Sequence, residues 1–375
     1  MHSLEMIKKI LTYPFKIVVK RYYIKRGYSP YYISFWKPEM ERNYRNCDLP
    51  KSQKKWAKER GFNPYRILQY SLTEENYRDV ISDRDYFYLY PLNNYYSKWI
   101  DDKLTMRYVL EPFKEFLPAY YYHILADRGV MPLMDVPSSY GYGVHELMRL
   151  LRDKKLLAFK MTAGTYGIGF YRVEFDGTKY IANGKEYDEN GFCSFVESLS
   201  DYIVTEYVEM HSQLKAIYPG AVNTIRCTVT NEHSDDPKLQ FAFMRIGTEK
   251  SGNVDNVAQG GMVCKVDKET GRYYDAQMLK DHVYFDVKNH PDTNILVEGV
   301  LPHWDLVKSK LVEMGNFWPQ LKWLGYDIAI TQDGFKIIEV NSHHGLHKAH
   351  EYPQELKDFL FRELKEKKDK YNYKS

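Results

Sequence analysis

The sequence has 375 residues, of which 44% are hydrophobic and 27% are charged, and its formal net charge is +3. This length and composition allow a sizeable core in two or three domains and exclude a disordered chain. The four cysteines lie far apart without a C-x-x-C spacing, which disfavours a zinc ribbon or a disulfide framework and predicts reduced thiols. No apolar run reaches the roughly 18 residues of a membrane span, and no signal peptide is evident, so we expect a cytoplasmic protein.

The first 60 residues are strongly basic. They contain 15 Lys and Arg against 5 Asp and Glu, a balance of +10, which leaves −7 for the rest of the chain. Between Lys8 and Arg26 seven basic residues alternate with aliphatic and aromatic ones. Such a pattern allows peripheral contact with an anionic membrane through residues 1–30, or a helix whose apolar side packs on its own protein. We predict no nucleic-acid partner.

A glycine-containing loop follows a Tyr-rich N-terminal region and a helical segment predicted over residues 101–116. Lys160 ends a predicted strand, and the loop residues Gly164, Thr165 and Gly167 precede another strand, "FYRVEFDG". Glycines let backbone N–H groups approach phosphate oxygens, and a nearby lysine supplies positive charge. The loop joins two strands and lacks G-x-x-x-x-G-K-[ST], so Walker and Rossmann motifs are both excluded by their context. By itself it is equally consistent with a flexible hairpin.

The C-terminal half is predicted to be mainly antiparallel sheet. Residues 203–340 contain several short apolar strands with one amphipathic helix at about 305–315. The chain ends in a helix that places Leu356, Phe359, Leu360 and Leu364 on one face, followed by a charged tail. The fold class predicted from this order is α+β.

A hairpin near the end of this half carries polar side chains in strand-forming sequence. Asp327 begins an apolar alternation, Asp333-Gly334 signals the turn, and Glu339 and Asn341 share one face of the returning strand. A three-residue loop, 332–334, places Asp327 opposite Glu339, whereas a two-residue Asp333-Gly334 turn places it opposite Val340; we favour the former. Oxygen ligands of this kind suit Mg²⁺ shared with nucleotide phosphates, so loop and hairpin together predict a magnesium-nucleotide site. The alternative is an exposed polar strand face.

Six segments in order resemble the ATP-grasp enzymes, and more narrowly the sugar-transfer-associated ATP-grasp proteins found with cell-surface polysaccharide biosynthesis. They are "WIDDKLT", "LAFKMTAGTYGIGF", "YIVTEYVE", "YPGAVNTIRCTVT", "VDNVAQGGMVCKVDKETG" and "GYDIAI...GFKIIEVNSHHG". The resemblance implies an ATP-grasp fold, with two α+β subdomains clasping ATP after a smaller N-terminal region. It divides the chain into 1–102 (N-terminal region), 103–205 (central subdomain), 206–350 (C-terminal subdomain) and 351–375 (helix and tail).

The resemblance also implies roles for individual residues. Lys103 and Lys160 would hold the ATP phosphates from opposite sides, under the loop residues Gly164, Thr165 and Gly167. The adenine would lie at a hinge, and the metal and the transferred phosphoryl group would lie on the C-terminal sheet. The hinge residues are Glu206, Tyr207 and Val208; the Mg²⁺ ligands are Asp327, Glu339 and Asn341; and the catalytic group is Lys160 with Arg226 and Arg245. Each arginine could instead be a structural ion-pair partner.

The implied reaction is ATP-dependent activation of a carboxylate as an acyl phosphate, which an amine or another nucleophile then attacks. The substrate would be a small-molecule or glycan-linked carboxylate, with an amine acceptor, in capsule or exopolysaccharide biosynthesis. An ATP-dependent kinase of the same fold and a catalytically inactive nucleotide-binding scaffold are the alternatives. The chain departs from the family at Ser342-His343-His344-Gly345, where a small residue, proline and glycine are common. His343 and His347 would chelate zinc only if this segment were helical.

Overall fold

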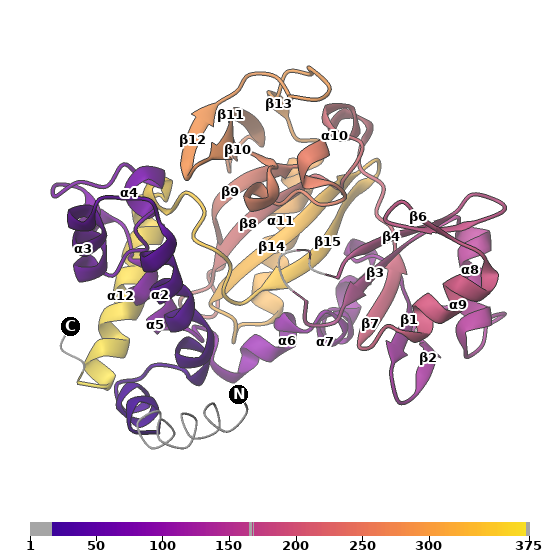
Figure 1. The fold of residues 1–375 in the computed structure, drawn as a ribbon, viewed down its shortest axis with the longest axis horizontal. Coiled ribbons are helices and arrows are strands. Elements are labelled where there is room, and N and C mark those ends of the chain that lie inside the picture. Colours follow the sequence, from indigo (N-terminus) through magenta and orange to yellow (C-terminus); the bar gives the residue numbers. More distant parts are fainter. Residues whose placement is uncertain (1–16, 165–166, 168, 373–375) are drawn as a thin grey trace, which may run out of the picture. The chain divides into compact units, whose positions relative to one another are not determined.

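The computed structural model describes residues 17–164, 167 and 169–372 (Figure 1). The chain forms two compact units. The smaller unit combines the N-terminal region up to Tyr95 with residues 280–284 and with the C-terminal segment from His343. The larger unit runs from Tyr96 to Leu279 and from Phe285 to Ser342. Every residue of the predicted nucleotide site therefore belongs to the larger unit.

The smaller unit is helical and rich in tyrosine. Its C-terminal helix α12 buries the four predicted residues Leu356, Phe359, Leu360 and Leu364, which confirms that amphipathic face. The Nζ of Lys367 donates to the carbonyls of Tyr88 (2.6 Å) and Tyr90 (3.0 Å), and so ties α12 to the end of α5. The elements are a helix at 17–25, η1 (Tyr32–Trp36), α2 (Lys37–Asn46), α3 (Lys51–Arg60), α4 (Arg66–Gln69), η2 (Tyr77–Asp79), α5 (Asp83–Leu89), η7 (Ala349–Glu351) and α12 (Gln354–Lys370).

The larger unit begins with short helices where the sequence predicts one helix over 101–116. Asp102 ends the first of them and caps the next, because its carboxylate accepts the N–H of Thr105 at 2.7 Å. Pro112 then opens a 3-10 turn. The predicted segment is therefore helical, but a capping residue and a proline divide it into short helices. The elements are η3 (Asn94–Ser97), which crosses the boundary between the units, α6 (Lys98–Asp101), α7 (Lys103–Val109) and η4 (Glu111–Phe116).

The central part of this unit is a seven-stranded antiparallel sheet in the order β2-β1-β7-β3-β4-β5-β6. Helices α8 (Val144–Lys154) and α9 (Glu189–Glu197) bury Leu147, Leu151 and Phe192 against it. The loop after β3 leads to β4, so it joins two strands as predicted. The strands are β1 (Tyr120–Leu125), β2 (Gly129–Pro132), β3 (Leu156–Met161), β4 (Tyr171–Phe175), β5 (Tyr180–Ala182), β6 (Lys185–Tyr187) and β7 (Tyr202–Glu206).

A second antiparallel sheet has the order β12-β11-β10-β9-β8-β14-β15, with β13 paired to β11. Helix α11 (Trp304–Phe317) lies within one core with β8, β14 and β15, and its position confirms the predicted helix at 305–315. The α+β prediction is confirmed. The remaining elements are β8 (Thr224–Thr230), β9 (Lys238–Ile246), β10 (Met262–Val266), β11 (Arg272–Lys280), β12 (Val283–Asp286), β13 (Gly299–Val300), β14 (Trp323–Thr331), β15 (Gly334–Asn341), α10 (Ser212–Ile217), η5 (Glu249–Ser251) and η6 (Val257–Gln259).

The β14–β15 hairpin places Asp327 opposite Glu339, as predicted, but by a different route. The turn is Gln332-Asp333, because Thr331 pairs with Gly334, and the three-residue loop was wrong. A β-bulge at Ile338 adds one residue to β15, so the pairing changes from Ile328 with Ile337 to Asp327 with Glu339. The bulge leaves Ile337 and Val340 in the core while Glu339 and Asn341 stay partly exposed.

None of the helices within the described residues is both long enough and apolar enough to cross a membrane.

Candidate functional site

Lys103 joins the glycine loop to the β14–β15 hairpin. It starts α7, whose first N–H donates to the carbonyl of Thr162 at 2.9 Å, just beyond the end of β3. Its Nζ donates to the carbonyl of Gly164 at 2.9 Å and lies 3.1 Å from Oε2 of Glu339. A single buried cation therefore lies between the predicted phosphate loop and a predicted metal ligand.

Lys160, the second lysine, lies on β3 opposite Ile203 of β7 and is buried. Burial, and to a smaller extent the neighbouring charge of Lys103, lower the pKa of its ammonium group to about 8, while Glu339 and Glu206 oppose the shift. A buried cation with this electrostatic environment is stabilised when an anion binds beside it. Lys160 is thus suited to a phosphate group.

We predict that nucleotide affinity depends on the protonation of Lys160. Phosphate oxygens favour the ammonium form, so the pKa of Lys160 rises on binding, and one proton is taken up between about pH 8 and the higher pKa of the complex. Affinity should then fall roughly tenfold per pH unit within that window. Calorimetric titration with Mg-ATP at about pH 8.5, in buffers of different ionisation enthalpy, measures the proton uptake. The Lys160→Gln variant should lose it, and equal uptake by both proteins would assign the proton elsewhere.

The predicted phosphate loop needs glycine where its backbone is left-handed. Gly167 has φ +70, in the left-handed region, and a Cβ there would lie 3.0 Å from Cγ1 of Val254. A side chain at this position would be both strained and crowded. Gly164 offers its carbonyl to Lys103, as described above. Thr165, the third predicted loop residue, lies outside the described residues.

The predicted hinge follows β7. The N–H of Glu206 donates to the carbonyl of Ala119 at 2.8 Å, and its Oε2 accepts the N–H of Ala119 at 3.1 Å. The ring of Tyr207 faces the guanidinium of Arg172, with 5.7 Å between the Cζ of Arg172 and the ring centroid, and Val208 is buried. These contacts fix the start of the segment that leads from one sheet to the other.

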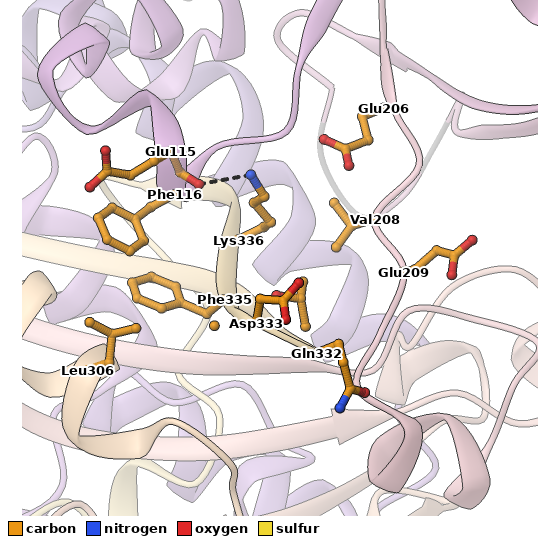
Figure 2. Close-up of a pocket in the computed structure, with 12 residues that line it drawn as sticks. Glu115, Phe116, Glu206, Val208, Glu209, Leu306, Gln332, Asp333, Phe335 and Lys336 are labelled. Carbon is orange, nitrogen blue, oxygen red and sulfur yellow. Dashed lines mark hydrogen bonds between the residues drawn. The ribbon is translucent and has the colours of Figure 1, made fainter. Parts of the chain in front are cut away.

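A cavity of about 470 Å³ lies beside this segment (Figure 2). Figure 2 shows Glu206, Val208 and Glu209 on one side, across from Glu115 and Phe116. The hairpin turn supplies the rest of the lining with Leu306: Thr331, Gln332, Asp333, Gly334, Phe335 and Lys336. Two of the three predicted hinge residues therefore line a cavity large enough for a small organic group.

The three predicted metal ligands lie together on the hairpin. Glu339 and Asn341 are partly exposed on β15, and Oε1 of Glu339 accepts the Nδ2–H of Asn341 at 3.0 Å. Asp327 lies opposite Glu339 on β14. Two carboxylates and an amide oxygen are hard donors, and this set fits Mg²⁺ that also binds substrate phosphates. Within the described ranges no group of three or more His, Cys, Asp and Glu side chains forms a metal cluster.

Both predicted arginines contact Asp327. The Nη2 of Arg226 lies 2.8 Å from Oδ2 of Asp327, its Nε donates to Oδ1, and the Nη2 of Arg245 lies 3.0 Å from Oδ2. Burial of Asp327 opposes its ionisation, but the two guanidinium groups outweigh burial and hold its pKa at about 2. Asp327 is therefore an anion that holds both arginines on the face of the sheet beside Glu339.

Two further residues extend this network. The Oγ1 of Thr224 accepts from Nη2 of Arg245 at 2.6 Å, and the N–H of Thr224 donates to Asp255 at 3.0 Å. Oδ2 of Asp255 lies 3.5 Å from Nε of Arg245. Sequence reasoning missed both residues, although Asp255 lies within the segment "VDNVAQGG" on which the resemblance rests. Asp255 reaches Arg245 because its loop folds back to β8. This return of the loop cannot be predicted from the local sequence pattern.

The histidine segment after β15 belongs to the smaller unit. The ring of His343 stacks on Tyr86, with 4.0 Å between centroids, and lies 4.9 Å from Trp36. Burial lowers the pKa of His343 to about 3, with a smaller contribution from Lys367, so the imidazole is neutral near neutral pH. Residues 342–348 are not helical, so the helix on which zinc chelation by His343 and His347 depended does not form. His343 is instead part of an aromatic core.

Residues 91–351 match the family model described as Sugar-transfer associated ATP-grasp. The chain belongs to this family. The predicted ATP-grasp fold is thereby confirmed, and membership supports ATP-dependent ligase activity. No curated protein matches this sequence.

Solved structures similar to this ATP-grasp chain include three ligases and synthetases. D-alanine–D-alanine ligase from Bacillus anthracis is 13% identical, with 72% of this chain and 69% of that chain covered and a TM-score of 0.35. D-alanyl-alanine synthetase A from Vibrio cholerae O1 is 13% identical, with 72% and 65% covered and a TM-score of 0.40. N5-carboxyaminoimidazole ribonucleotide synthetase from Thermotoga maritima is 9% identical, with 67% and 44% covered and a TM-score of 0.34. Likenesses this distant assign no substrate.

Proposed function

We propose that this ATP-grasp protein is an ATP-dependent ligase that activates a carboxylate as an acyl phosphate for attack by an amine or a related nucleophile. The observation that carries the proposal is the position of Lys103, between the carbonyl of Gly164 and the carboxylate of Glu339. These two contacts support a single site made from the predicted phosphate loop and the predicted metal ligands. Family membership supports the same reaction class.

The proposed roles follow from charge and position. Lys103 and Lys160 bind the phosphates of ATP, and the cavity beside Glu206 and Val208 accepts the adenine. Asp327, Glu339 and Asn341 would hold Mg²⁺, which neutralises phosphate charge when it is bound. Arg226 and Arg245 are held in place by their ion pairs with Asp327 and stabilise the transferred phosphoryl group. Phosphoryl transfer depends mainly on positioning and charge, so no further nucleophilic side chain is needed.

The proposed substrate is a sugar acid, an amino acid or a glycan-linked carboxylate used in making a cell-surface polysaccharide such as a capsule. This part of the proposal is supported by the family's description as sugar-transfer associated. A panel of uronic and amino acids, each tested with and without amines, identifies the pair that stimulates ADP release.

Isotope transfer tests the reaction type. A carboxylate labelled with ¹⁸O should deliver one labelled oxygen to inorganic phosphate, because the acyl phosphate breaks between the carbonyl carbon and the bridging oxygen. A kinase would instead form a stable phosphorylated product and release no labelled phosphate. ATP binding without turnover on any tested acceptor pair would favour the inactive scaffold. The Lys160→Met variant is the negative control, since it removes the charge proposed to bind the phosphates and should abolish the label transfer.

A further inference from the structure

Exposed apolar side chains concentrate near the start of the described chain. Of the nineteen large hydrophobic side chains exposed among the described residues, five lie between residues 18 and 35. Scattered exposed apolar residues are ordinary, but five within eighteen consecutive residues are a local concentration in the sequence. Their exposed fractions are 64% for Val18, 51% for Tyr22, 41% for Ile24, 45% for Tyr31 and 43% for Phe35.

The same segment carries positive charge without nearby acid. No Asp or Glu occurs between residues 6 and 38, while Lys20, Arg21, Lys25 and Arg26 all fall in that interval. Within the described part of the chain, the first basic side chain that pairs with a carboxylate is Lys37, which meets Glu41. Arg26 stacks over the ring of Tyr22, 3.6 Å from its centroid. The exposed residues of this segment are therefore both apolar and cationic.

Helical geometry puts both kinds of side chain on the exposed side of the helix, where they are interleaved. At 100° per residue, the exposed residues of the helix at 17–25 fall within an arc of about 200°. We call this arc the outer face; it consists of Val18, Lys20, Arg21, Tyr22, Ile24 and Lys25. Val19 and Tyr23 point the opposite way, and the ring of Tyr23 packs 5.2 Å from Tyr28 and 5.8 Å from Tyr32. The helix thus packs on its own unit through one side and leaves the outer face uncovered by the described residues.

We propose that the outer face docks on the surface of an anionic lipid bilayer. Val18, Tyr22 and Ile24 would enter the boundary between headgroups and acyl chains, where aliphatic and aromatic groups are stabilised, while Lys20, Arg21 and Lys25 meet lipid phosphates. Nucleic acid fits less well, because the aliphatic Val18 and Ile24 find no apolar counterpart along a phosphate backbone. The face lies in the smaller unit, which contains none of the predicted ATP-site residues.

Vesicle co-sedimentation of the full chain tests this proposal. The protein should sediment with phosphatidylcholine vesicles that contain roughly 30% phosphatidylglycerol, remain unbound with pure phosphatidylcholine, and dissociate as salt rises. Each cation near an anionic surface contributes roughly fivefold to partitioning. The triple variant Lys20→Gln/Arg21→Gln/Lys25→Gln should therefore bind about 100-fold more weakly.

Two further variants separate a lipid surface from general charge attraction. Lys51→Gln/Lys55→Gln/Lys58→Gln removes the same charge from exposed positions on α3 and should bind as the unchanged protein does. Val18→Ser/Ile24→Ser keeps all charges and should weaken binding at least tenfold, because two apolar contacts with the boundary region are lost.

Three results would overturn the proposal. They are equal binding of the outer-face triple variant and the α3 variant, equal binding to neutral vesicles, and unchanged binding of Val18→Ser/Ile24→Ser. Tighter binding to short DNA or RNA duplexes than to anionic vesicles, with the same salt dependence, would assign the face to nucleic acid. Circular dichroism of each variant confirms that it is folded. ATP turnover without vesicles should be the same in all variants, so a failure here leaves the proposed ligase reaction standing.

Discussion

Replacing Glu339 by Gln should lower the rate of ADP formation by about 100-fold to 1000-fold at limiting Mg²⁺ while leaving the fold intact. The substitution keeps the size of the side chain but removes the charge that faces Lys103 at 3.1 Å and that would help to hold the metal. Glu339 is only partly buried, and its hydrogen bond from Asn341 can be kept by an amide oxygen. Steady-state ADP release over a Mg²⁺ titration, together with thermal melting, measures the two effects separately.

A matched control for this substitution is Glu313→Gln. Glu313 is exposed on α11, where it pairs with Lys310 at 2.7 Å, and it is not one of the predicted site residues. It should change neither turnover nor the Mg²⁺ dependence, because an exposed ion pair contributes little. Unaltered turnover in Glu339→Gln at every Mg²⁺ concentration would remove the hairpin as the metal site.

Replacing Asp327 by Asn should cost stability as well as activity. The substitution removes the one anion that both Arg226 and Arg245 contact, and so leaves two buried guanidinium groups insufficiently compensated. Breaking a buried ion pair from one side costs about 3 to 5 kcal/mol in the free energy of unfolding. Urea denaturation followed by circular dichroism measures the loss. The Asp305→Asn variant, whose carboxylate is exposed and pairs with Lys308 at 3.0 Å, should lose less than about 1 kcal/mol.

The pH dependence of this loss identifies its cause. The pKa of Asp327 is lowered from 3.8 to about 2, so the ion pair stabilises the folded state fully above the ordinary pKa. That stabilisation is lost as the pH falls through about 2, and the unfolding free energies of the two proteins should converge there. Equal free energies of unfolding for Asp327→Asn and the unchanged protein at neutral pH would show that Asp327 does not hold the arginines.

Much of the site could be predicted from local pattern. Side chains that share a strand face can be predicted because the two-residue period of a strand is a local property. This applies to the alternation around Asp327 and to the spacing of Glu339 and Asn341. The glycines after Lys160 predict a loop with unusual backbone angles, because the conformational freedom of glycine is also a local property. Helix α11 and the buried face of α12 were confirmed because their apolar spacing matches the helical period.

Tertiary structure decided how these pieces meet. The pairing of Asp327 with Glu339 depends on a bulge at Ile338. The bulge keeps Ile337 and Val340 in the core, and a two-residue turn without it would have shifted the strand register. The ion pairs of Asp327 join residues on three strands, and Asp255 reaches Arg245 only through the fold of its loop.

The sequence by itself therefore determined the α+β class, the glycine loop after Lys160 and the polar face of the hairpin, since each depends on periodicity or on residue chemistry within a short segment. Only the tertiary structure decided that Lys103 lies between Gly164 and Glu339, and that the exposed residues of the helix at 17–25 combine cations with apolar groups. The physical reason is that contacts between distant segments depend on strand order and on burial. Both are set by how the whole chain packs, and a short stretch of sequence does not carry that information.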